Sequence, residues 1–536
     1  MHVKLCVRGT DLGQAGGIQI IQGEDADVSM KFNVGTFLLG RARSDPDKTA
    51  VIFDGRAISF RELNRRSNKW AQAFAKMNTG KGKRVGVLLP NRNEFLEAFF
   101  GLAKIGAIPV LLNSRLAPSK LEYICRDSGI SGLIFDERFR EEAEVLKTVL
   151  KVDPCVGVGS RIPNWAEDLD YINRFADIEP ESATAGDDPA AILYTSGSTG
   201  NPKGVVRNHS SYLCLSKGMK ESLDSRHRTI LLVVPLYHGW GLNFAVTAVD
   251  RGDTVVLMKS FNTLEALETI QVERVDTFLA VRPMLNRIAL VPAFETYLTG
   301  LRIIETTEPI PPEIRQKFLT HGIIMRRSYG LAETGFVTLA TGSDIFKKPD
   351  SEGLPLSCVE VRVVNEKGDD LSPGEVGEII VRSPAIMKGY WNNPTATAQV
   401  IKDGWFHTGD LGKLDEEGCV YISGRMKDVI ISGGEIVSPL EVEKVLHQHP
   451  GVLEAAVIGL PDSVWGEKVT AIVRPRDNSA LTAEEVVTFC RGKLAPFMVP
   501  KEVILTDEAV PYDPTSGKLF RKMLRERFNV GSTVVG

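Results

Sequence analysis

A buried strand that runs into a loop of glycines and hydroxyls constrains this chain more than any other stretch. Four apolar residues, 190–193, precede the segment Tyr194-Thr-Ser-Gly-Ser-Thr-Gly-Asn-Pro-Lys-Gly204. The apolar run predicts a strand, and the glycines give the loop the freedom to wrap around an anion. Backbone N–H groups and hydroxyls supply donors, so the segment predicts a loop that binds polyphosphate oxygens. The candidate ligands are Thr195, Ser196, Gly197, Ser198, Thr199, Gly200 and Lys203.

The spacing in this loop excludes a Walker-type nucleotide loop. A Walker loop has Gly immediately before its Lys and Ser or Thr immediately after it. Here Pro202 precedes Lys203 and Gly204 follows it, so no hydroxyl stands where Mg²⁺ would be held. The sequence therefore predicts a phosphate loop of another kind.

The surrounding residues alternate strand and helix patterns, as in an α/β fold with a mostly parallel sheet. Apolar strand patterns occur in two groups, which predict two α/β subdomains of the βαβ type: 83–90 and 107–112 in the first, and 229–235, 254–258, 277–281 and 301–304 in the second. After Gly353 the strands become shorter and are separated by Gly and Pro turns, which predicts a small β-barrel-like subdomain.

The pattern of predicted helices and strands changes again near residue 425. A helix pattern begins at about Ser438, and an apolar strand pattern covers 455–459. Together they predict a small α+β domain. We therefore expect a large N-terminal domain, 1–424, followed by a C-terminal domain, 425–536.

Composition excludes several classes of protein. The chain has 64 Lys and Arg against 68 Asp and Glu, so no basic excess is available to bind nucleic acid or an anionic membrane. The most apolar region, 96–112, includes Glu97, Lys104 and Pro109, which predicts a buried helix and strand and no transmembrane segment. Seven cysteines without a Cys-x-x-Cys pair, and residues 1–30 without a signal-peptide pattern, favour a cytoplasmic location.

Six motifs occur in a fixed order between about Phe60 and Arg521. They are the loop 194–204, Pro235-Leu-Tyr-His-Gly-Trp-Gly241, Tyr329-Gly-Leu-Ala-Glu-Thr334, Trp405-Phe-His-Thr-Gly-Asp410, Gly424-Arg-Met-Lys-Asp-Val-Ile430 and the segment from Pro511 to Lys518. In this order and spacing the chain resembles the adenylate-forming superfamily, and within it an acyl-CoA ligase. The resemblance implies a carboxylate that attacks the α-phosphate of ATP, followed by transfer of the acyl group to coenzyme A.

The resemblance also implies roles for the residues around the nucleotide. Tyr329 stacks on the adenine, with Gly330 beside it, and Asp410 and Arg425 bind the ribose. Glu333 holds Mg²⁺ through oxygen, which this cation prefers. Lys518 contacts the reacting carboxylate and the α-phosphate, and Lys427 is the hinge about which the mobile C-terminal domain rotates between half-reactions. Thr307 and Glu308 stand at the strand end that lines the adenine pocket.

The acid and coenzyme A sites follow from the same resemblance. The acyl pocket contains His238, Trp240, Arg282 and Thr306, and the pantetheine arm passes Gly433 and Gly434. The chain departs from the usual pattern in two places: Ala332 replaces a common Thr, and Ile304-Glu-Thr-Thr-Glu-Pro309 replaces a Gly-Gly-Ala-Pro-like segment. An inward-facing Arg282 would favour a polar or dicarboxylic acid, because a buried guanidinium needs an anion.

Three functions remain open at this point. The first is an ATP-dependent ligase that joins an aromatic, fatty or other organic acid to coenzyme A, and the second is an enzyme that passes the adenylate to a carrier protein or an amine. The third is a non-catalytic protein that binds an acid or a nucleotide. Retention of Lys518, Glu333, Asp410 and Arg425 argues against the third.

Overall fold

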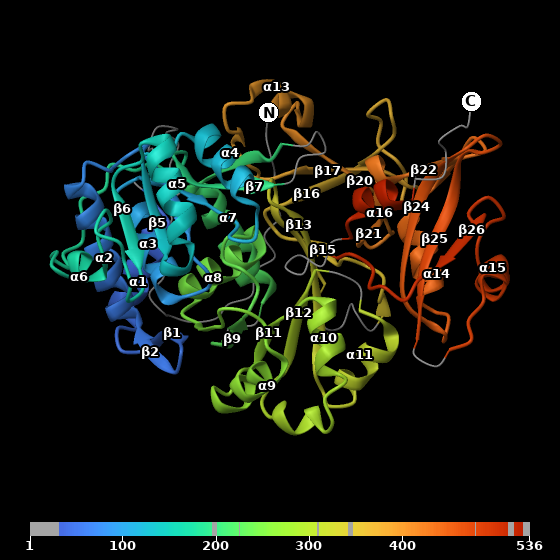
Figure 1. The fold of residues 1–536 in the computed structure, drawn as a ribbon, viewed down its shortest axis with the longest axis horizontal. Coiled ribbons are helices and arrows are strands. Elements are labelled where there is room, and N and C mark those ends of the chain that lie inside the picture. Colours follow the sequence, from blue (N-terminus) through green and yellow to red (C-terminus); the bar gives the residue numbers. More distant parts are fainter. Residues whose placement is uncertain are drawn as a thin grey trace, which may run out of the picture.

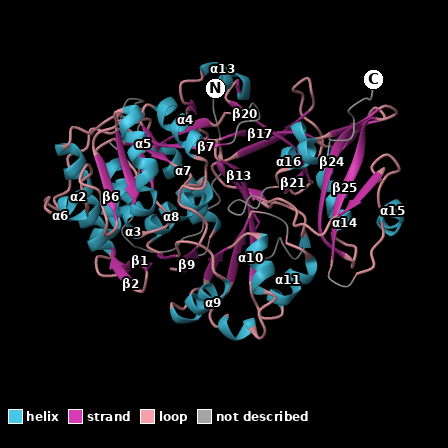
Figure 2. Ribbon diagram, viewed as in Figure 1, coloured by secondary structure: helices cyan, strands magenta, loops and turns pink. Residues whose placement is uncertain are grey.

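The computed structural model describes residues 32–195, 201–223, 226–307, 310–340, 347–476, 479–512 and 519–528. Their strands form four sheets, and the three from the N-terminal part of the chain lie together while the fourth, within residues 430–505, stands to one side (Figure 1). Helices cover the first two sheets of the N-terminal part, and long strands dominate the C-terminal part (Figure 2). The mixed α/β class predicted from the sequence is confirmed.

The first sheet has the order β18-β8-β7-β4-β3-β5-β6, in which the pairings β18–β8 and β8–β7 are antiparallel and the others are parallel. Its strands are β3 Arg84–Leu88, β4 Ile108–Leu111, β5 Gly132–Asp136, β6 Cys155–Val158, β7 Pro189–Thr195, β8 Lys203–Asn208 and β18 Gly389–Tyr390. The helices of this part are α1 Gly35–Ser44, α2 Phe60–Lys76, α3 Asn93–Lys104, α4 Pro118–Ser128, α5 Arg140–Leu150 and α6 Leu169–Asn173.

The second sheet has the order β15-β14-β13-β12-β11-β9-β10-β1-β2. Its strands are β1 Thr49–Phe53, β2 Arg56–Ser59, β9 Thr229–Leu232, β10 Thr254–Leu257, β11 Thr277–Leu279, β12 Ile303–Thr306, β13 Ile324–Leu331, β14 Gly335–Ala340 and β15 Leu354–Pro355. The helices are α7 His209–Ser222, α8 Gly239–Arg251, α9 Thr263–Val272, α10 Arg282–Ile288 and α11 Pro312–Leu319. The hairpin β1–β2 thus joins a sheet built mainly from residues beyond 229.

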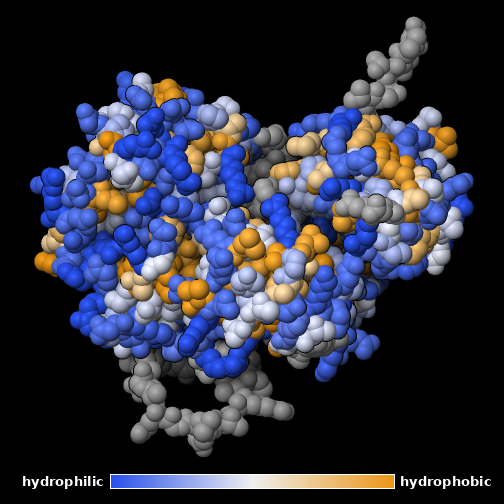
Figure 3. Space-filling view, turned by 60° about the horizontal axis from the view of Figure 1, so that its bottom comes forward, coloured by the Kyte–Doolittle hydropathy of each residue, from blue (hydrophilic) through white to orange (hydrophobic). Residues whose placement is uncertain are grey.

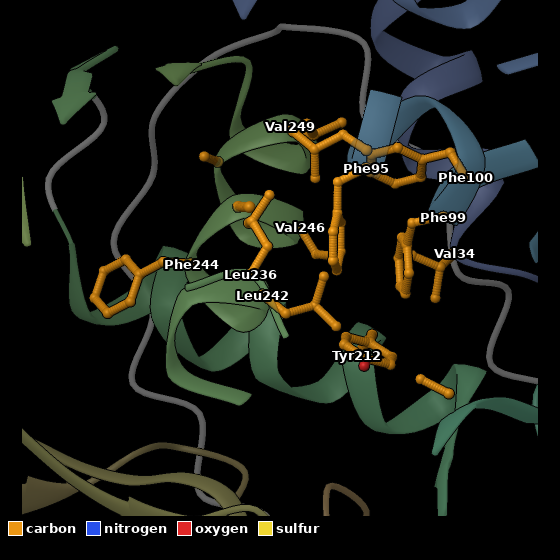
Figure 4. Close-up of a cluster of buried hydrophobic side chains, with 14 of the residues drawn as sticks. Val34, Phe95, Phe99, Phe100, Tyr212, Leu236, Leu242, Phe244, Val246 and Val249 are labelled. Carbon is orange, nitrogen blue, oxygen red and sulfur yellow. The ribbon is translucent and has the colours of Figure 1, made fainter. Parts of the chain in front are cut away.

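Alternation along the strands explains how both sheets are buried on two faces. In β9, Ile230 and Leu232 face one apolar cluster while Leu231 faces another. The larger cluster fills the space between the first two sheets, where Phe95 and Phe99 of α3 lie opposite Leu242 of α8 (Figure 4). This core fixes the two sheets, and with them the motifs at their ends, relative to each other.

Two smaller sheets complete the chain. The third is antiparallel and contains β16 Glu360–Val364, β17 Gly377–Arg382, β19 Ile401–Lys402, β20 Trp405–Leu414 and β21 Val420–Arg425, with helix α13 Pro394–Val400. The fourth contains β22 Ile430–Ser432, β23 Glu435–Val437, β24 Val452–Asp462, β25 Gly466–Pro475 and β26 Glu502–Leu505, with α14 Pro439–Leu446, α15 Ala483–Arg491 and α16 Arg521–Phe528. The short turn Met426–Asp428 joins them, so the predicted hinge residue Lys427 lies between the two sheets.

The charged residues of the apolar region 96–112 are buried and paired. Lys104 Nζ donates to Asn64 Oδ1 and Asn68 Oδ1 at 2.6 Å and forms an ion pair of 2.7 Å with Glu179. None of the described helices combines the length and the apolar character that a membrane span needs. On the face shown in Figure 3, hydrophilic residues predominate and hydrophobic residues form separate patches.

Candidate active site

A buried cluster of Tyr329, Asp410 and Arg425 joins the second sheet to the third. Tyr329 stands near the end of β13 and donates its hydroxyl to Asp410 Oδ2 at 2.8 Å. Asp410 and Arg425 are cross-strand partners in β20 and β21, and Arg425 Nε lies 2.8 Å from Asp410 Oδ1. Burial and the neighbouring carboxylate of Asp410 raise the pKa of Tyr329 well above its usual value, so its hydroxyl stays a donor at neutral pH.

This cluster forms one wall of a cavity of about 460 Å³. Residues at the start of α8 also line it. The cavity brings together seven of the residues predicted from the sequence: His238, Trp240, Thr307, Tyr329, Gly330, Asp410 and Arg425. It also contains residues that the sequence did not single out, among them Asn243, Ser328, Phe336 and Ile422.

His238 occupies the N-cap position of α8, where its carbonyl accepts from Leu242 N–H at 3.0 Å. The loop before it is held by Asn91, which follows β3 in the other sheet. The buried Asn91 side chain donates to the Val234 carbonyl at 2.9 Å and accepts from Leu236 N–H at 2.8 Å. A residue about 150 positions away thus fixes the approach to His238, and no local sequence pattern marks it.

The turn after Tyr329 requires glycine at two positions. A Cβ on Gly330 would lie 2.0 Å from the Gly335 carbonyl oxygen, and Gly335 has a φ of +67°. The buried Arg207 donates through Nη1 to the Ala332 carbonyl at 3.2 Å. Burial lowers the pKa of Arg207, opposed by Tyr212, Cys214 and Glu333. Arg207 is a further site residue that the sequence analysis missed.

The two strands that flank the predicted phosphate loop place its exit near Glu333. Thr195 and Lys203 are cross-strand partners in β7 and β8, while residues 196–200 lie outside the described residues. Lys203 Nζ lies 5.0 Å from the ring centroid of Tyr390, and the Tyr390 hydroxyl donates to Glu333 Oε1 at 2.9 Å. Tyr390 therefore connects two predicted ligands. Its only sequence signal was an aromatic residue after Gly389.

The structure separates two of the predicted acyl-pocket residues from the others. Arg282 and Thr306 line a second cavity of about 480 Å³. His238 and Trp240 line the first cavity and not this one. The two cavities share Leu440, Lys444 and Arg521. Their assignment to the acyl pocket stays a prediction.

Several predicted residues lie elsewhere. Glu308 and Lys518 are outside the described residues, although Leu519 lines the second cavity. Gly433 and Gly434 have φ values of +62° and +86°, and Gly433 N–H donates to the Trp465 carbonyl at 2.8 Å. Neither glycine borders either cavity in the described part of the chain, so their role toward coenzyme A stays a prediction.

Comparison with known proteins identifies the family. The AMP-binding enzyme family matches residues 39–391, and the AMP-binding enzyme C-terminal domain matches residues 441–518. Feruloyl-CoA synthase of Amycolatopsis sp is 36% identical over 92% of this chain and 99% of its own length, and the long-chain-fatty-acid–CoA ligase FadD13 of Mycobacterium tuberculosis is 35% identical over 93% and 99%. Among solved structures, the amide bond synthetase McbA from Marinactinospora thermotolerans superposes with a TM-score of 0.84 and 27% identity over 93% of this chain and all of that one. The chain therefore belongs to the AMP-binding enzyme family of adenylate-forming enzymes, in which it is most like the acyl-CoA ligases.

Proposed function

We propose that the protein is an ATP-dependent carboxylic acid–CoA ligase, which forms an acyl-adenylate with release of pyrophosphate and then transfers the acyl group to coenzyme A. One observation carries the proposal. A single cavity is lined by a cluster of a hydroxyl, a carboxylate and a guanidinium and also by the start of a helix. Such a cavity can hold a nucleoside and an anion side by side.

The nucleoside end is the cluster around Asp410. A carboxylate has about four acceptor positions, so Asp410 can bind ribose hydroxyls while it keeps Tyr329 and Arg425. The Tyr329 ring borders the cavity and offers a stacking face for adenine, and Thr307 lies at the same cavity. The buried Ser328 hydroxyl also borders the cavity and has no hydrogen-bond partner among the described residues, so it is available to a ligand.

The acid end is the start of α8. His238, Gly239 and Trp240 line the cavity there, and a helix N-terminus favours a negatively charged group such as a carboxylate. The buried Trp240 Nε1 finds no acceptor among the described residues. The carboxylate is already ionised at neutral pH, so it can attack the α-phosphate without a general base, and the residues need only orient it and stabilise charge.

Magnesium fits this site as a partner of the phosphates. The described residues contain no cluster of three candidate ligands for a metal ion, and Glu333 is a single half-buried carboxylate oriented by Tyr390. Mg²⁺ in nucleotide enzymes is often held by one or two carboxylates together with phosphate oxygens and water. When bound, it would neutralise phosphate charge, while Glu333 holds it and Lys203 adds a positive charge beside Tyr390.

Both half-reactions use residues of the C-terminal domain. We assign Lys518 to adenylate formation, Lys427 to the hinge, and Gly433 and Gly434 to passage of the pantetheine arm, as the family resemblance implies. Lys518→Ala should nearly abolish adenylate formation and leave thioester formation from a preformed adenylate intact. Equal loss of both half-reactions would contradict that role. Consumption of ATP and coenzyme A suits the cytoplasmic location that the sequence predicts.

The second candidate function sends the adenylate to an amine or to a carrier-protein thiol. It is favoured by the structural similarity to an amide bond synthetase over nearly the whole chain. Pyrophosphate release should therefore be measured over a panel of aromatic, fatty and dicarboxylic acids, with and without coenzyme A. Release that yields a thioester only with coenzyme A supports the ligase, release without thioester supports the second candidate, and no release with any acid refutes both.

A further inference from the structure

A contact between the N-terminal and C-terminal domains lies in the second cavity. Arg282, the first residue of α10, places its guanidinium 4.9 Å from the ring centroid of Tyr512. Arg282 and Tyr512 both border the 480 Å³ cavity, and both are only partly exposed. A guanidinium within about 6 Å of an aromatic ring is attracted to its face, and the attraction grows as water is excluded.

Tyr512 is itself firmly placed in the C-terminal domain. Its hydroxyl donates to the Ala455 carbonyl at 3.4 Å, and its ring packs against the small apolar cluster that includes Val510 and Leu524. Burial raises the pKa of Tyr512 to about 12, opposed by the positive charge of Arg282. The side chain is therefore neutral, and its aromatic face is available to Arg282 at physiological pH.

Tyr512 also pairs with Leu519, the residue that directly follows Lys518 in the sequence. Tyr512 and Leu519 form an antiparallel bridge, and Phe520 N–H donates to the Pro511 carbonyl at 2.9 Å. Residues 513–518 lie outside the described part of the chain. Lys518 directly precedes Leu519 in the sequence, and consecutive Cα atoms are about 3.8 Å apart. A restraint on Tyr512 and Leu519 is thus a restraint on both ends of this segment.

The charges around Arg282 favour its orientation. Glu443 lies near enough to interact electrostatically with Arg282, and it also accepts two bonds of 2.7 and 2.6 Å from Arg521. His447 shares the cavity, and burial together with Arg282 and Arg476 lowers its pKa to about 4. His447 is consequently neutral at pH 7 and does not repel the guanidinium.

An ion pair crosses the same domain boundary and provides a control. Arg476 of the C-terminal domain pairs with Glu313 of α11, and the two side chains are 40% and 57% exposed. Exposed ion pairs of this kind contribute little to stability. Arg476 does not line the second cavity.

We propose that Arg282 is a positioning residue that holds Tyr512 and Leu519 of the C-terminal domain against the N-terminal domain during adenylate formation. The inference rests on the proposed function, because it assigns Arg282 to one half of that reaction. The chemistry needs Lys518 beside the reacting carboxylate only in the first step, so the contact matters for that step alone. Arg282 would act through Tyr512, and this role is an alternative to the acyl-pocket role predicted for it from the sequence.

The experiment compares the two half-reactions in Arg282→Met, Arg282→Lys, Tyr512→Phe and Arg476→Met. Arg282→Met keeps an apolar stem and loses the charge, so we expect at least about a tenfold fall in kcat for acid-dependent ATP–pyrophosphate exchange, with the KM for ATP unchanged. Thioester formation from the preformed acyl-adenylate should stay within about twofold of wild type. Arg282→Lys retains a cation and should keep most of the exchange rate. Tyr512→Phe retains the ring but loses the hydroxyl that interacts with Arg282, so its rate should fall between those of Arg282→Met and wild type. Arg476→Met should resemble wild type throughout.

Hydrogen–deuterium exchange supplies a readout that does not depend on activity. Peptides that cover Val510 to Tyr512 should exchange faster in Arg282→Met and unchanged in Arg476→Met. Three results would overturn the inference: equal losses in both half-reactions, an unchanged rate of ATP–pyrophosphate exchange in Arg282→Met, or the same loss of that rate in Arg476→Met as in Arg282→Met. Failure of the proposed function has a different signature: wild-type protein would release no pyrophosphate with any acid, even if the hydrogen exchange at Tyr512 responded as expected.

Discussion

Replacing Asn91 by Ala tests whether a buried amide in one sheet sets the position of His238 at the end of the other. The substitution removes the donor to the Val234 carbonyl and the acceptor for Leu236 N–H, which lie at 2.9 and 2.8 Å in the wild-type protein. Both backbone groups sit in a buried loop, and an unsatisfied buried group costs about 1–3 kcal/mol. We expect the free energy of unfolding to fall by about 2–4 kcal/mol.

The same change should reach the reaction. The loop from Val233 to Tyr237 leads into His238, which lines the cavity, and a small displacement of a positioning group is costly in rate. The value of kcat/KM for the acid should therefore fall by about tenfold or more, while the KM for ATP changes less, because Tyr329 and Asp410 do not depend on this loop. Urea unfolding and pyrophosphate release with varied acid measure the two effects.

Asn262 offers a matched control. Its side chain also makes two hydrogen bonds to the backbone, here accepting both from Leu264 and Glu265 N–H at 3.1 Å each, but it caps α9 in an exposed position. Asn262→Ala should cost about 1 kcal/mol of stability and leave the KM for the acid unchanged. If Asn91→Ala loses no more stability than Asn262→Ala, or if its kcat/KM for the acid equals that of wild type, the assignment of Asn91 to the loop before His238 is refuted.

Three further predictions concern the nucleotide side and the core. Gly330→Ala should raise the KM for ATP or prevent folding, because the new Cβ would lie 2.0 Å from a backbone oxygen. Gly40→Ala, in a helix with open space around it, should be neutral or slightly stabilising. Equal behaviour of the two variants in thermal unfolding and ATP titration would contradict this prediction. Asp410→Asn should weaken ATP binding and lower the free energy of unfolding by about 2 kcal/mol, because it leaves Arg425 without its anionic partner. An ATP affinity that calorimetry finds unchanged would argue against this cluster as the ribose site. Burial lowers the pKa of His209 to about 4, so between pH 6.5 and 4 the unfolded chain binds a proton that the folded chain does not. The free energy of unfolding should therefore fall as the pH drops through this window, by about 3 kcal/mol relative to His209→Gln. Parallel curves of stability against pH for the two proteins would refute the shift.

Residues that act through local backbone chemistry were open to prediction from the sequence. The strand before Tyr194 is β7, and the helix predicted near Leu96 is α3. The family resemblance also implied that Tyr329, Asp410 and Arg425 serve one nucleotide, and the three residues line one cavity although they lie in different strands. Each of these predictions rests on a pattern that is complete within a few residues: an apolar period, a glycine where a side chain does not fit, or a motif.

Residues that act at long range could not be predicted in this way. Arg207, Tyr390 and Asn91 are single residues whose partners lie more than fifty positions away, and nothing in their own neighbourhood distinguishes them from structural residues. Arg282 shows the opposite problem. The sequence marked it as unusual, but only the arrangement of the domains places it against Tyr512 and away from Trp240.

The pairing of β18 with β8 has a consequence for the order in which the protein can be made. Strand β8 follows the phosphate loop directly, and its outer edge is covered by Gly389 and Tyr390, which pair with Val206 and Val205. A ribosome reaches these residues almost two hundred codons after the loop. Until then β8 is an open edge, and an open edge can pair with another nascent chain. Fragments that stop before residue 389 should therefore aggregate more than those that include Tyr390, which makes this two-residue strand a natural limit for dividing the gene.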